Sequence, residues 1–119
     1  MAIRIPVILR KGQVEVKVKA LLNTGFETDE PVVVVPYDIA LNLGLKPSSK
    51  TTYLGPGSII GEAYLAGEVE VIVESDNIRR SVKAYAVIEP KESEVVLSDK
   101  AIAELGIVID LKNSKWWLT

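Results

Sequence analysis

The residues most able to form a functional site are Asn23, Thr24 and Gly25. They follow an alternating segment, Val14 to Leu22, and precede an apolar run, Val32 to Val35. Asn and Gly favour tight turns, so the triplet is expected in a turn between two strands. A side-chain amide donates and accepts hydrogen bonds, but it neither takes a proton from water nor holds a negative charge. The turn therefore offers a neutral polar group and not a general base.

The composition restricts what other chemistry is available. The 119 residues include no His and no Cys. This excludes Ser-His-Asp and Cys-His catalysis, disulfides, and metal sites built on thiolate or imidazole. We therefore expect no metal and no cofactor. A net charge of −2, from 14 basic and 16 acidic residues, gives no electrostatic reason to expect nucleic acid or an anionic membrane surface as a partner.

Period-two alternation of Val, Ile and Leu dominates the chain and predicts half-buried antiparallel strands. Lys11-Gly12 and Asp76-Asn77 are the expected hairpin turns. The run from Val32 to Val35 is apolar on both faces, which predicts a buried central strand. No linker or repeat divides the chain, so residues 1–119 are expected to form a single domain.

Two short segments have the sequence pattern of a helix, residues 37–43 and residues 99–105. Gly44 ends the first segment. Ser98 is the expected N-cap of the second, and Gly106 its C-terminal stop. Asp38 and Asp99 each open one of these helices, where a carboxylate suits the positive helix end and needs no functional role.

These segments together resemble a known protein family. The turn at Asn23, the segment from Pro36 to Leu45 and the segment from Glu94 to Ile107 are similar in order and type to the motifs of retropepsin-like (retroviral-type) aspartic proteases. The likeness is strongest to the small prokaryotic members that carry Phe, here Phe26, after an Asp-Thr-Gly triplet. Ser98 stands where that family usually has Gly.

The resemblance implies an all-β fold, a small closed barrel with one or two short helices. It also implies a homodimer in which each chain supplies one turn at the two-fold axis. In that family two aspartates share one proton, so that one activates a water while the other polarises the scissile carbonyl. The catalytic positions carried over are Asn23 (where the family has Asp), Thr24, which would brace the two turns, and Gly25, which would let the backbone turn.

Three explanations of Asn23 stay open: an engineered Asp-to-Asn variant, a natural non-catalytic relative, or an accidental likeness in an ordinary turn. The resemblance places Phe26 and Asp29 near the substrate. Asp29 and Glu30 are the nearest carboxylates that could replace the missing one, although a solvated acidic loop is the simpler interpretation.

The Gly-rich stretch from Tyr53 to Gly61 occupies the place of the family's flap, a hairpin that closes over bound peptide. The expected substrate contacts within it are Leu54, Gly57, Ile59 and Ile60. An ordinary hairpin is the alternative. A phosphate-binding loop is not indicated, because no Lys-Ser/Thr pair follows.

Trp116 and Trp117 are adjacent near the end of the sequence. In an alternating strand one indole must face outward or into a partner, which favours an interface. The alternative is that both rings cap the open end of the barrel. A domain that supplies half a site must pair to complete it, so a homodimer is expected in either case.

The first residues lack a signal-peptide core, and no apolar stretch approaches the ~20 residues that span a membrane. We therefore expect a cytoplasmic location. The single Gln and single Met favour a thermophilic source.

Taken together, the sequence predicts a retropepsin-like aspartic endopeptidase domain that acts as a homodimer on extended peptides or unfolded protein, here inactive because Asn23 replaces the catalytic Asp. The alternative is a non-catalytic peptide- or protein-binding module that uses the same dimer cleft.

Overall fold

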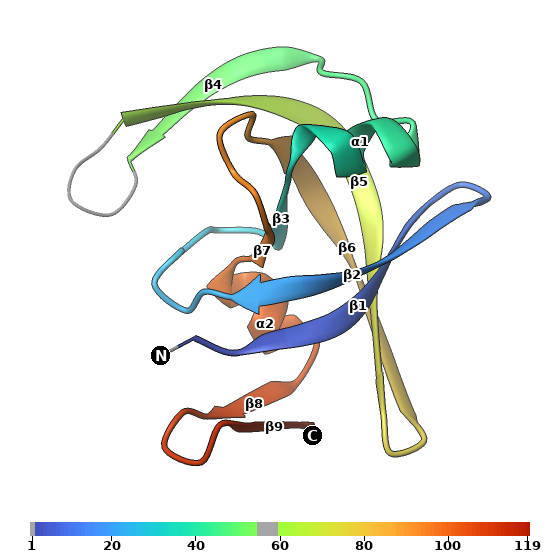
Figure 1. The fold of residues 1–119 in the computed structure, drawn as a ribbon, viewed down its shortest axis with the longest axis vertical. Coiled ribbons are helices and arrows are strands. Elements are labelled where there is room, and N and C mark those ends of the chain that lie inside the picture. The colour runs from blue at the N-terminus through green and yellow to red at the C-terminus, as the bar shows by residue number, and fades with distance from the viewer. Residues whose placement is uncertain (1, 55–59) are drawn as a thin grey trace.

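The computed structural model describes residues 2–54 and 60–119, with only the backbone for residues 51–54 and 60–62. Strands dominate it (Figure 1). The elements in chain order are β1 (Arg4–Lys11), β2 (Val14–Leu22), β3 (Val32–Val35), α1 (Tyr37–Leu43), β4 (Ser49–Leu54), β5 (Ile60–Ser75), β6 (Ile78–Ile88), β7 (Val95–Leu97), α2 (Asp99–Glu104), β8 (Ile107–Asp110) and β9 (Lys115–Leu118).

Among the described residues, six strands close into a barrel in the order β1-β2-β7-β3-β6-β5, because β5 pairs back onto β1. The β2–β7 and β3–β6 pairs are parallel and the others antiparallel. β4 pairs with β5 outside this ring. The closed barrel with two short helices confirms the predicted fold class.

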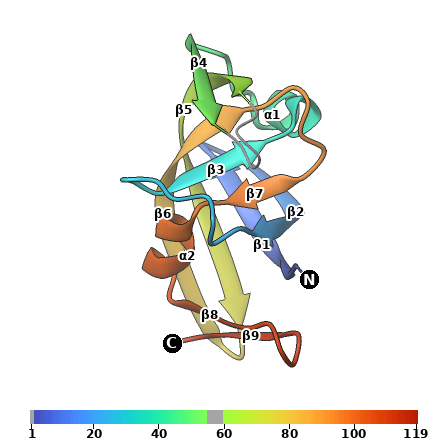
Figure 2. The same cartoon turned by 90° about the vertical axis from the view of Figure 1, so that its left-hand side faces the viewer.

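Alternation places one face of the barrel strands inside, as β1 shows. In β1, Ile5, Val7 and Leu9 are buried, whereas the residues between them are exposed or half-buried. β3 lies between β7 and β6, as a central strand should (Figure 2). Its inner residues, Val33 and Val35, are fully buried, whereas its outer residues are only half-buried. The prediction of a central strand is confirmed, but its outer face is less covered than expected.

The hairpin turns follow from the residues that tolerate left-handed backbone. Asp76 and Asn77 have φ of 49° and 66°, as a two-residue type I′ turn requires. The predicted turn at Lys11-Gly12 is displaced by one residue, because Lys11 pairs with Val14 and so still belongs to the strand. Gly12, with φ of 60°, and the residue after it form that turn.

The two helices begin where they were predicted. α1 ends at Gly44, which has φ of 73°. α2 starts after Ser98, whose hydroxyl accepts a hydrogen bond from the Ala101 N–H. It ends one residue earlier than predicted, since Leu105 is its cap. α1 packs against β1 and β2, and α2 against β3, β6 and β8.

β8 and β9 pair only with each other among the described residues and lie beside α2, apart from the barrel sheet (Figures 1 and 2). The hairpin is fixed to the barrel by its apolar face, where Ile107 and Leu118 are buried and Trp116 packs against the core. Trp117 points the other way and is 44% exposed. One indole therefore faces the core and one faces outward. Within the described residues, no helix has the length and apolar character needed to cross a membrane.

Candidate functional site

Asn23 begins the loop that leaves β2, and its own amide shapes the turn. Its backbone N–H donates to the Leu97 carbonyl at 3.3 Å, and its carbonyl accepts from the Phe26 N–H at 3.1 Å. Its side-chain Oδ1 accepts from the Gly25 N–H at 3.1 Å. Asn23 is half-buried, whereas Thr24 and Gly25 are exposed. The triplet therefore forms a compact turn in which Thr24 and Gly25 are accessible to solvent.

Asp99 holds the middle of the same loop. Its backbone N–H donates to the Phe26 carbonyl at 2.9 Å, and its Oδ1 accepts from the Thr28 N–H at 2.9 Å. The Thr28 hydroxyl donates to the Glu30 carbonyl at 2.6 Å. From the sequence, Asp99 was expected only to begin a helix. In the structure it also fixes a loop 71 residues away in the chain.

Ser98 holds the far end of the loop. It is fully buried, and its hydroxyl accepts from the Val32 N–H at 3.0 Å and from the Ala101 N–H at 3.2 Å. Its own N–H donates to the Val32 carbonyl at 3.0 Å. A glycine here would leave the Val32 N–H without this acceptor. Leu97, Ser98 and Asp99, which we name the β7–α2 junction, thus hold the loop at its start, middle and end.

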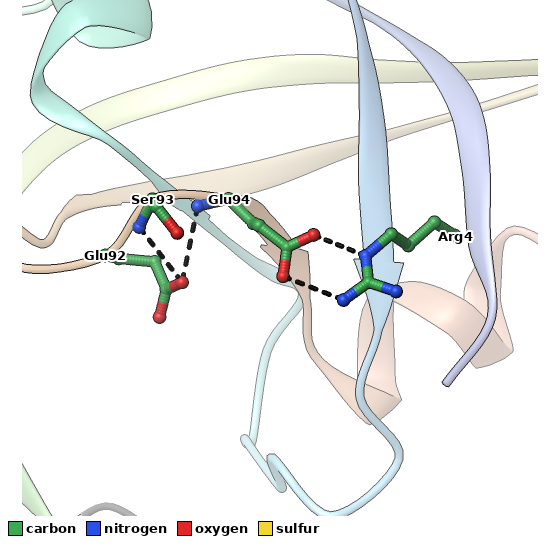
Figure 3. A network of polar contacts seen from close by, with 4 residues as sticks. All are labelled: Arg4, Glu92, Ser93 and Glu94. Carbon is green, nitrogen blue, oxygen red and sulfur yellow. Dashed lines mark hydrogen bonds and ion pairs between the residues drawn. The ribbon is translucent and has the colours of Figure 1, made fainter. Parts of the chain in front are cut away.

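An ion pair reinforces the strand that enters this junction. Arg4 of β1 reaches Glu94, the residue before β7, with Nη2 3.1 Å from Oε2 and Nε bonded to Oε1 (Figure 3). This hydrogen bond with Arg4 lowers the pKa of Glu94 and raises that of Arg4. The Glu92 carboxylate accepts from the N–H groups of Ser93 and Glu94 (Figure 3). The pair links β1 to the start of β7 across β2.

An open hollow of about 470 Å³ lies beside the turn. Its lining residues are Ala2, Ile3, Leu21, Leu22, Asn23, Thr24, Ile109 and Leu111. Of the predicted site residues it contains Asn23 and Thr24, but not Gly25, Phe26 or Asp29. The walls from the N-terminal segment and from the β8–β9 region were not predicted, because only the fold brings these distant segments to the turn.

The other predicted contacts lie around the hollow or outside the described residues. Phe26 is half-buried in the turn, and Asp29 is exposed. Leu54 and Ile60 are backbone partners that close the β4–β5 ladder. Gly57 and Ile59 lie outside the described residues, as do the side chains of Leu54 and Ile60. The described end of the β4–β5 hairpin and the loop that leaves β2 lie on the same side of the molecule (Figure 1).

The described residues contain no group of three or more His, Cys, Asp or Glu side chains placed to hold a metal ion. The chemistry at the hollow is therefore that of an amide, a hydroxyl and apolar walls.

No protein-family model matches the chain, and no curated protein sequence matches it. Among solved structures, the chain is similar to the retroviral protease-like domain of Ddi1 from Leishmania major, with a TM-score of 0.58 and 15% sequence identity. The match covers 99% of this chain and 90% of that domain. At this identity the likeness establishes the fold: the chain has a retroviral protease-like fold, as the sequence motifs predicted.

Proposed function

We propose that this chain is one half of a homodimeric, retropepsin-like cleft that holds extended peptides or unfolded protein. Asn23, Thr24 and Gly25 of both chains would then meet at the two-fold axis. One observation carries the proposal: in a barrel of retroviral protease-like fold, the Asn23 turn leaves β2 and is hydrogen-bonded to the β7–α2 junction. A turn held at one place by a closed barrel is a suitable half-site, and a half-site needs a second copy.

With Asn23, the chain would bind peptides in this cleft with little or no cleavage. Water activation needs a group that takes a proton, and the Asn23 amide is not one. An aspartate pair at the same position would share one proton and supply both the base and the acid of peptide hydrolysis. The residue at position 23 would therefore decide whether the cleft acts as an aspartic endopeptidase or only binds peptides.

Parts of the cleft follow from the same proposal. The β4–β5 hairpin would be the flap over the bound peptide, and Phe26 and Asp29 would lie along it. The position of the hairpin and the loop on one side of the molecule supports this arrangement (Figure 1).

The second candidate is a non-catalytic peptide- or protein-binding module that uses the same cleft naturally. The hydrogen bond from the Gly25 N–H to the Asn23 Oδ1 favours it, because the amide oxygen satisfies the turn without any carboxylate. In this case Asn23 would take part in binding and would not be a replacement that removed catalytic activity.

The decisive variant is Asn23→Asp. It should create the shared-proton pair, so that hydrolysis of a diverse peptide library appears with an acidic, bell-shaped pH profile. The rate should exceed that of the Asn23 chain by roughly several orders of magnitude, as is typical when a catalytic group is gained or lost. Asn42→Asp, at an exposed position on α1, makes the same change in charge but keeps Asn23, so this variant should stay inactive.

Sedimentation of both proteins should show twice the 13.0 kDa chain mass. An Asn23→Asp variant that is folded, dimeric and inert across the library would refute the enzyme half of the proposal and leave the binding module. A stable monomer would refute both halves.

A further inference from the structure

We draw no further inference here: the strongest candidate, the partly exposed apolar row that Val34, Val87 and Leu65 form in register across β3, β6 and β5, only extends the peptide-binding cleft already proposed and restates an established property of retropepsin-like proteases.

Discussion

The two segments that flank the hollow are held in opposite ways. The loop of residues 23–31 has no regular secondary structure, yet hydrogen bonds to the β7–α2 junction fix it at its start, middle and end. The β8–β9 hairpin is fully regular, yet it forms a sheet of its own in the described part of the chain and is attached mainly through apolar side chains. Local regularity is thus a poor guide to how a segment is placed.

The difference matters because polar and apolar attachments respond differently to substitutions. When a buried N–H loses its acceptor, the free energy of unfolding falls because one polar group is left unpaired, and the segment that carries it can shift. An apolar face loses stability in proportion to the area uncovered and tolerates small shifts. The loop should therefore be sensitive to the loss of single atoms, and the hairpin to the loss of whole side chains.

The largest stability effect is expected in the hairpin, at Trp116→Ala. Its indole is half-buried against the core, so truncation should lower the free energy of unfolding by about 3 kcal/mol, the lower end for large aromatic residues. Trp117→Ala is the matched control on the opposite face and should cost about 0.5 kcal/mol. Urea unfolding measures both. If Trp117 belongs to the dimer interface, its loss should instead weaken association in sedimentation.

Ser98→Ala tests the loop. It removes one oxygen that two N–H groups share in a fully buried place, so we expect a loss of about 2 kcal/mol. Ser81→Ala, at an exposed position of β6, should change stability by less than about 0.5 kcal/mol. Equal effects at the two positions would mean that the hydroxyl of Ser98 does not hold the loop.

Gly106→Ala tests the open end of the hairpin, where Gly106 before β8 lies opposite Thr119 after β9. Thr119 donates to the Gly106 carbonyl through both its N–H and its hydroxyl. A Cβ at Gly106 would stand 2.8 Å from the Thr119 Oγ1, whereas a Cβ at Gly44 would meet nothing within 4 Å. Both glycines have φ above 70°, so each substitution should cost about 1 kcal/mol from the backbone. The loss should be larger at Gly106, and equal losses would contradict a close contact with Thr119.

The smallest effect is expected for the exposed pair of Arg4 and Glu94, which solvent screens. Because the pKa of Glu94 is lowered on folding from its ordinary value of 4.5, the pair stabilises the protein above that pH. Its contribution is lost as the pH falls through the lowered pKa. The stability difference between native protein and Arg4→Gln should therefore shrink on acidification, and a difference that grows would have the wrong sign. Urea unfolding at a series of acidic pH values measures it.

Much of the fold could be predicted because its signals are local. Alternation identified β1 and β2, and caps such as Ser98 and Gly44 located the helices. The β1–β2 turn was misplaced by one residue because Lys11 fits both a strand end and a turn. The second role of Asp99 could not be predicted, since its partner Thr28 is 71 residues away and a carboxylate that opens a helix already has a local explanation. The positions of Ile109 and Leu111 in the wall of the hollow could not be predicted for a similar reason, because nothing near them in sequence points to Asn23.

The shortest strand of the barrel has a consequence for the order of folding. β7 has three residues, all buried, and it fills the gap between β2 and β3, which come more than 60 residues earlier in the chain. Until Val95 to Leu97 enter that gap the ring stays open, and the Asn23 N–H has no Leu97 carbonyl to meet. Such long-range closure is slow compared with hairpin formation. On a ribosome, the Asn23 turn would therefore be one of the last parts of the domain to form, because it must wait for the β7–α2 junction to be synthesised.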